Sequence, residues 1–194
     1  MAMINGTHAD YLPNWYESTI TIVFPGDRYI TPVYDAYGTG PDMWGVKWTN
    51  LGPSPGIDGS MVAKGFRLFN TVEDWSNHVV FPDYSKIPLD LILNKMKEAM
   101  GYDKNIHYLQ LAFLSGAFER LNQMIGMEEA LASFYDFPDE THEYFDAFCN
   151  FRIKCIEMAY DVVQPDCIAM QDDWGANNNM LFSPGIWREF INYN

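Results

Sequence analysis

Two short apolar runs on either side of a long helical pattern limit the possible folds of this chain more than any other feature. Tyr108–Phe113 and Cys167–Met170 each have the length and apolar character of a buried strand. Between them, residues 128–134 and 139–163 carry apolar side chains at helical spacing, and Pro138 marks the start of the longer helix. Strand, helices and strand form a βαβ unit, so we expect two parallel strands joined by a right-handed crossover.

The N-terminal part has a different character, with short extended stretches and many turn residues. Thr and Ile alternate over residues 18–24, which predicts a strand, and residues 11–17 and 29–35 are two further strand candidates. Residues 44–49 indicate one arm of a hairpin, and residues 65–69 are its expected return arm. This hairpin is either a surface elaboration or a cover over a substrate, and the sequence leaves both interpretations open.

Composition and charge exclude several classes of protein. A chain of 194 residues has the size of one domain, and its 48% hydrophobic and 20% charged residues indicate a folded globular protein. The formal net charge of −14 repels phosphate backbones, which disfavours nucleic-acid binding. No apolar run approaches the length of a membrane-spanning helix, so we expect no membrane partner. Three cysteines without metal-type spacing predict reduced thiols and a cytoplasmic location.

Polar side chains crowd the end of the second apolar strand. Asp172 and Asp173 come just after it, and Trp174, Asn177 and Asn178 follow. Ligands of α/β sheets bind at the carboxyl ends of the strands, which is where these side chains should lie. An inward-facing carboxylate of the pair could transfer a proton, orient a polar ligand or bind a metal. Alternatively, one Asp caps or braces the loop that follows, because Asp is common in turns.

Glu119 is a candidate for the same site. It lies just past the first strand of the βαβ unit. In a parallel sheet this position belongs to the same ligand-binding rim as Asp172. An ordinary solvated pair of Glu119 with Arg120 is the alternative, and the sequence favours neither.

The sequence contains no local metal or nucleophile motif. The four histidines are scattered, at His8, His78, His107 and His142, and none has a partner at zinc-binding spacing. A phosphate-cradling glycine loop and a nucleophile elbow are also missing from the sequence. We therefore assign no metal ligand, and we expect any chemistry to depend on the carboxylates.

Five segments, taken in their order and spacing, resemble the uroporphyrinogen decarboxylase-like superfamily, especially its corrinoid-dependent methyltransferase branch. These segments are Asp10–Trp15, Asp42–Trp48, Phe113–Leu121, Asp172–Gly175 and Ser183–Phe190. The resemblance implies a (β/α)8 TIM barrel, of the α/β class, with its site at the carboxyl ends of the strands.

A complete barrel of this kind takes about 250 residues. The resemblance therefore implies a partial barrel, with roughly the first four or five strands and an N-terminal hairpin elaboration. We expect a single incomplete domain over 1–194, in which 1–105 holds the N-terminal strands, the hairpin and helices. The remaining residues, 106–194, hold the βαβ unit and the Asp-Asp-Trp-Gly rim.

The resemblance leaves two chemistries, which the residues help to separate. Decarboxylases of the superfamily bind a polycarboxylate through an arginine-rich segment near the first strand, whereas residues 31–40 contain no arginine. We therefore expect the other chemistry, in which a methyl group moves between a small methylated substrate and a corrinoid carried by a partner protein. The methyl donor could be a methyl ether, an amine or a thiol. Uroporphyrinogen decarboxylation is the less favoured reaction.

In this interpretation a carboxyl group protonates or hydrogen-bonds the oxygen atom from which the methyl group departs. Aromatic and amide side chains contact the substrate. The expected catalytic residues are Asp172, Asp173 and Glu119, and the expected substrate contacts are Trp174, Asn177, Asn178, Asp35 and Trp44. Some thiol-using members of the superfamily bind zinc, and the resemblance places those ligands beyond residue 194.

Other interpretations remain open. The chain could be a non-catalytic half-barrel or a truncated remnant that pairs with another chain, because a half-barrel exposes strand edges and apolar surface. It could also be a binding protein that kept the pocket and lost the chemistry. We expect a homodimer or a complementing C-terminal half as partner, besides the corrinoid protein and the small methyl donor.

Overall fold

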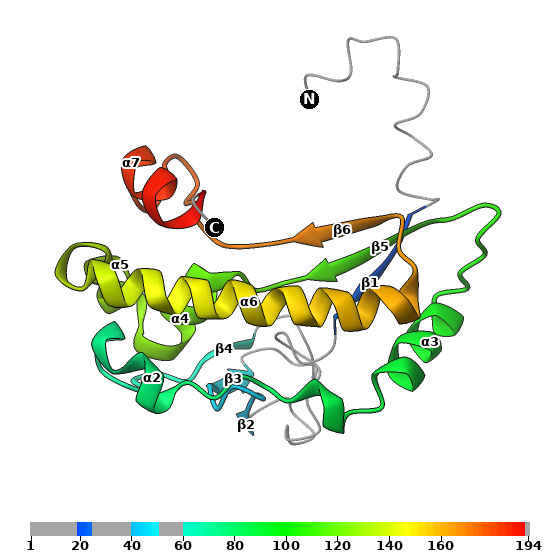
Figure 1. Ribbon diagram of the computed structural model, residues 1–194, viewed down its shortest axis with the longest axis horizontal. Coiled ribbons are helices and arrows are strands. Elements are labelled where there is room, and N and C mark those ends of the chain that lie inside the picture. Colours follow the sequence, from blue (N-terminus) through cyan, green and yellow to red (C-terminus); the bar gives the residue numbers. More distant parts are fainter. Residues whose placement is uncertain (1–18, 25–39, 51–59, 193–194) are drawn as a thin grey trace, which may run out of the picture.

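Two small sheets organise residues 19–24, 40–50 and 60–192, which are the residues that the computed structural model describes (Figure 1). The first sheet is parallel, with strand order β1-β5-β6, and is built from β1 (Thr19–Val23), β5 (Tyr108–Phe113) and β6 (Cys167–Met170). The second is antiparallel, with order β2-β3-β4, and is built from β2 (Gly40–Pro41), β3 (Lys47–Asn50) and β4 (Ser60–Val62). The fold is mixed α/β, and over the described residues the parallel sheet does not close into a barrel.

Helices occupy most of the chain between and after the strands of the parallel sheet. Before β5 lie the 3-10 helix η3 (Val72–Asp74), α2 (Trp75–His78), the 3-10 helix η4 (Tyr84–Lys86) and α3 (Leu89–Ala99). Between β5 and β6 lie α4 (Ala117–Ile125), α5 (Met127–Asp136) and α6 (Pro138–Val163), and the C-terminal elements are α7 (Pro184–Ile186) and the π-helix η5 (Trp187–Ile191). None of the helices in the described part is both long and apolar enough to cross a membrane.

The predicted βαβ unit is confirmed. β5 and β6 are parallel neighbours, with Gln110 opposite Cys167 and Phe113 opposite Met170. The long helix α6 begins with Pro138 at its first position, where proline is tolerated because no helical partner for its nitrogen is needed. The alternating stretch predicted as a strand near residue 20 is also confirmed, since β1 pairs in parallel with β5. The strand candidates at 11–17 and 29–35 lie outside the described residues.

The two faces of the parallel sheet differ in character. Leu109, Leu111 and Phe113 alternate along β5 and pack in a buried cluster with Cys155 and Ala159 of α6. The opposite face carries a polar row that crosses all three strands: the Thr21 hydroxyl donates to Gln110 Oε1 at 3.0 Å, and Gln110 Nε2 donates to Cys167 Sγ at 3.6 Å. The helix layer therefore covers the apolar face of the sheet.

The hairpin is present, but its predicted return arm is wrong. β3 pairs with β4, so the chain returns at residues 60–62, and residues 65–69 are not a strand. Gly65 has a φ of +74°, which ends the extended backbone at a turn. The hairpin is also not a surface elaboration, because Trp44, Val46 and Trp48 are buried in the main apolar cluster.

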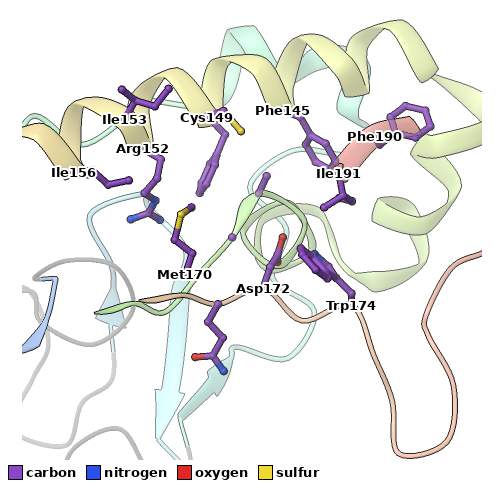
Figure 2. Close-up of a pocket in the computed structure, with 14 residues that line it drawn as sticks. Phe145, Cys149, Arg152, Ile153, Ile156, Met170, Asp172, Trp174, Phe190 and Ile191 are labelled. Carbon is purple, nitrogen blue, oxygen red and sulfur yellow. The ribbon is translucent and has the colours of Figure 1, made fainter. Parts of the chain in front are cut away.

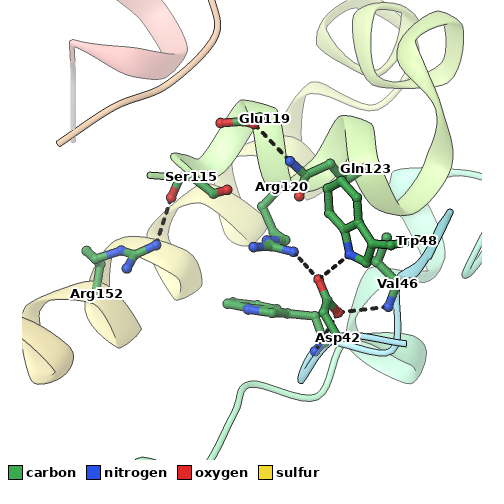
Figure 3. Close-up of polar contacts among 9 residues, drawn as sticks. Asp42, Val46, Trp48, Ser115, Glu119, Arg120, Gln123 and Arg152 are labelled. Carbon is green, nitrogen blue, oxygen red and sulfur yellow. Dashed lines mark hydrogen bonds and ion pairs between the residues drawn. The ribbon is translucent and has the colours of Figure 1, made fainter. Parts of the chain in front are cut away.

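One buried carboxylate connects this hairpin to α4 (Figure 3). Asp42 Oδ1 accepts from the backbone N–H groups of Trp44 and Val46, at 2.9 and 3.0 Å. Asp42 Oδ2 accepts from the indole of Trp48 at 3.0 Å and from the guanidinium of Arg120 at 2.7 Å. The Arg120 guanidinium also lies over the Trp44 ring, 5.0 Å from its centroid. Both charged side chains are fully buried, so their charges depend on each other for compensation.

We expect Asp42→Ala to destabilise the fold by about 3–5 kcal/mol, because it leaves the Arg120 charge buried without its carboxylate. Urea unfolding, followed by circular dichroism, measures the change. Asp83→Ala is the matched control, because Asp83 forms an exposed ion pair with Lys86 at 2.8 Å, and such pairs contribute little. Equal unfolding midpoints for the two variants would contradict this role for Asp42.

Candidate functional site

The carboxyl ends of β5 and β6 meet at one rim of the parallel sheet, and Asp172 connects them. Its Oδ1 accepts from the backbone N–H of Glu119 at 2.7 Å, and its Oδ2 accepts from that of Phe118 at 3.2 Å. These are N–H groups of the first turn of α4, which have no partner inside the helix. Asp172 therefore caps α4 from the neighbouring strand. The alternative considered from the sequence was a cap on the loop that follows the Asp pair, and capping of α4 was not predicted.

Gly116 makes this arrangement possible. It is the N-cap residue of α4 and has no side chain with which to cap the helix itself. A Cβ atom at Gly116 would overlap the carboxyl carbon of Asp172, although the backbone conformation of Gly116 suits any residue. The glycine is required here because the carboxylate approaches the backbone so closely.

The Asp172 carboxyl group retains its proton to higher pH than an exposed aspartate. Its burial raises its pKa, and this effect outweighs the lowering by the N–H groups of Glu119 and Phe118 and by the Trp174 indole. A group of this kind can donate a proton or a hydrogen bond at a pH where exposed aspartates are ionised.

A pocket of about 410 Å³ lies between the rim and α6 (Figure 2). Phe145 and Cys149 of α6 lie on one side of it, opposite Asp172 and Trp174, and Phe148 of the same helix also lines it. Phe190 and Ile191 of the C-terminal helix close one end. Most of the lining is aromatic or aliphatic, with few polar groups, which is typical of a site for a small molecule.

Arg152 adds a positive charge to the wall of this pocket. Its Nη2 donates to the backbone carbonyl of Ser115 at 2.7 Å, which joins α6 to the end of β5. Its guanidinium lies 4.7 Å from the ring centroid of Phe113 and 5.2 Å from that of Phe148. The side chain is 2% exposed, so these contacts fix its position.

Among the expected site residues that the structure describes, two line the pocket and the others lie outside its wall. Asp172 and Trp174 both line it. Asp173 is exposed, so Asp172 is the member of the pair that turns inward, on the side of α6. Asn177 and Asn178 are exposed in a turn that the Gly175–Met180 bridge closes.

Glu119 and Trp44 also lie away from the pocket wall. The Glu119 side chain is 3% exposed and accepts from Gln123 Nε2 at 2.9 Å, and its backbone N–H contacts Asp172. The solvated pair considered for Glu119 and Arg120 is absent among the described contacts, because both are buried and Arg120 pairs with Asp42. Trp44 is a core residue, 5.8 Å from Phe148 between ring centroids. Asp35 lies outside the described residues.

Sequence reasoning did not identify the α6 wall of the pocket. Phe145, Phe148 and Cys149 recur at helical spacing, which predicts core side chains and gives no sign that they border a cavity. Arg152 falls on the same face of that helix. A charged residue within an apolar stripe is unusual, and it is the sequence signal that could have identified this face as a pocket wall. Over the described residues, no group of three or more His, Cys, Asp or Glu is placed to hold a metal ion.

We expect Gly116→Ala to destabilise the fold by about 1–3 kcal/mol, because the added methyl group displaces Asp172 from the end of α4. Thermal unfolding tests the stability, and nuclear magnetic resonance of the Phe118 and Glu119 amides tests the lost hydrogen bonds. Gly175→Ala is the control, because a Cβ there would come no closer than 3.9 Å to its nearest neighbour. Unchanged amide shifts in Gly116→Ala would contradict the close approach.

Comparisons with protein-family models, with curated proteins and with solved structures found no match for this chain.

Proposed function

We propose that this chain carries the substrate pocket of a corrinoid-dependent methyltransferase. The observation that carries the proposal is a carboxyl group with a raised pKa, Asp172, in a mostly apolar pocket at the carboxyl ends of parallel strands. The sequence resemblance to the methyltransferase branch of the uroporphyrinogen decarboxylase-like superfamily supports the choice of chemistry.

The pocket suits a small, uncharged and mainly apolar methyl donor. Its volume of about 410 Å³ falls in the range of roughly 300–1,000 Å³ that is typical of small-molecule sites. Phe145 and Phe148 both line the pocket, so an aryl or alkyl body could pack against their rings. The net charge of −14 disfavours a substrate with many carboxylates. Among the expected donors, a methyl ether therefore fits best.

Asp172 is the proton donor in this proposal. When the bond between the ether oxygen and its methyl group breaks, the oxygen keeps the electron pair and takes the proton of Asp172. The backbone N–H groups of Phe118 and Glu119 then stabilise the carboxylate that forms, because they point at its two oxygens from the end of a helix. A corrinoid on a partner protein would supply the methyl acceptor.

We expect Asp172→Asn to lower the rate of methyl transfer by about 100- to 10,000-fold, because asparagine cannot give up a proton. The assay follows demethylation of methoxybenzenes with a reduced corrinoid. Wild-type activity should fall as the pH rises through the raised pKa of Asp172, since only the protonated form donates. Asp173→Asn is the control, because Asp173 is exposed, and its activity should be unchanged. Equal losses in both variants would contradict the assignment.

A second candidate function is pairing with another chain, and the outer edge of β6 favours it. Met170 is 62% exposed, Ile168 is 37% exposed, and Ile153 of α6 is 52% exposed. β6 is an edge strand of the described sheet, and an exposed apolar edge is a common place for strand pairing. We infer a homodimer through this edge as the alternative to catalysis.

If this edge pairs, we expect light scattering to give the mass of a dimer, and Met170→Lys should shift it towards the monomer. A charge on the pairing face opposes burial of that face. Met61→Lys is the matched control, because Met61 is 51% exposed on β4 of the other sheet. A wild-type protein that stays monomeric at every concentration measured would refute the pairing.

A further inference from the structure

The wall of the pocket contains a cation that belongs to the protein itself. Arg152 of α6 lines the pocket (Figure 2). Its side chain is 2% exposed, and an arginine keeps its positive charge even when it is buried. The contacts that hold its guanidinium include the carbonyl oxygen of Ser115 and the rings of Phe113 and Phe148, which carry no net charge. A ligand in this pocket therefore binds near a positive charge.

We propose that Arg152 excludes ligands with a positively charged methylated nitrogen from this pocket. Methylated amines are one of the three classes of methyl donor that the sequence resemblance leaves open, and amines of this kind are cations at neutral pH. The inference rests on the proposed function for these donor classes, and it adds the residue that selects against one of them.

Arg152 occupies ring surface that a cationic ligand would need. Methylated ammonium groups bind to proteins over the faces of aromatic rings, so an aromatic pocket would ordinarily suit them. Here the Arg152 guanidinium already lies over the ring of Phe148, 5.2 Å from its centroid, and Phe148 lines the pocket. A ligand ammonium that approached this ring would meet a like charge there.

The repulsion does not require contact between Arg152 and the ligand. Most residues that line the pocket are aromatic or aliphatic, and charges interact more strongly in such surroundings than in water. Salt also screens a buried charge less than an exposed one. An uncharged ether of the same shape experiences no such repulsion, so the selection acts on cations alone.

Asp172 offsets this charge less than an exposed aspartate would. It has the only carboxyl group among the described residues that line the pocket. Its burial raises its pKa, so the group stays protonated to higher pH than an exposed aspartate does. A protonated carboxyl group has no charge with which to attract an ammonium ligand.

Two ligands of the same shape and different charge test the inference. Phenyltrimethylammonium and tert-butylbenzene differ only in the central atom, which is a positively charged nitrogen in the first and a carbon in the second. We expect the affinity for the cation, divided by that for the hydrocarbon, to rise by about 10- to 100-fold in Arg152→Met. Comparing this ratio between proteins cancels the different hydration of the two ligands. Nuclear magnetic resonance titration of the full chain measures both affinities.

Two variants that keep a charge at position 152 or remove one elsewhere are the controls. Arg152→Lys retains the positive charge in the pocket wall, and Arg188→Met removes a charge that is exposed and does not line the pocket. Both should give the ratio of the wild type. If Arg152→Met does not fold, citrulline at position 152 replaces the guanidinium with an uncharged group of the same shape, and the same rise is expected.

Three results would each overturn the inference. They are an unchanged ratio once the charge at position 152 is removed, an equal rise in Arg152→Lys or Arg188→Met, and no binding of tert-butylbenzene to the wild type. The first shows that Arg152 does not select, the second that the charge in the pocket wall is not the cause, and the third that the pocket does not take ligands of this shape.

The demethylation assay separates this inference from the proposed function. If the ratio rises as expected while the wild type transfers no methyl group from methoxybenzenes, the exclusion of cations stands and the methyltransferase proposal fails. If methyl transfer occurs and depends on Asp172 while the ratio is unchanged without the charge of Arg152, the proposed function stands and this inference fails.

Discussion

The described structure depends on the buried ion pair between Asp42 and Arg120. Four donors converge on one carboxylate, two from the backbone of the hairpin, one from an indole and one from α4. Such a pair contributes orientation more reliably than net stability, because desolvation offsets much of its attraction. Here it fixes α4 against the antiparallel sheet, and α4 is the helix whose first turn receives Asp172. The position of the pocket wall thus depends on a contact between residues that do not line the pocket.

Three consecutive residues of α4 connect the two parts of the described fold. The backbone N–H groups of Phe118 and Glu119 point at Asp172, and the side chain of Arg120 points at Asp42. The first contact joins α4 to the end of β6, and the second joins it to the hairpin. A helix of nine residues is too short to be stable alone in water, so these tertiary contacts are what maintain it.

Alternating or helical patterns and short apolar runs were sufficient to predict β1, β5, β6 and α6 from the sequence. β5 and α6 bury a regular apolar face, whereas β6, expected to be buried, lies at the sheet edge with Ile168 and Met170 exposed. The start of α4 gave no local signal, since its N-cap residue is a glycine and its cap comes from a distant strand. The return arm at 65–69 was misplaced because Phe69 is buried without being in a strand. Strand alternation indicated that only one of Asp172 and Asp173 turns inward, but choosing between them required the helix that Asp172 contacts.

The contact between Gly116 and Asp172 has a consequence for how sequences of this fold can vary. The two positions share a single small volume, since the carboxyl group of one occupies the space where the other would have a Cβ. A relative with a side chain at the position of Gly116 could keep the same backbone only with a smaller residue at the position of Asp172. It would then lose the external cap of α4, and a serine, threonine or aspartate at the glycine position could replace that cap locally. Substitutions at these two positions should therefore occur together.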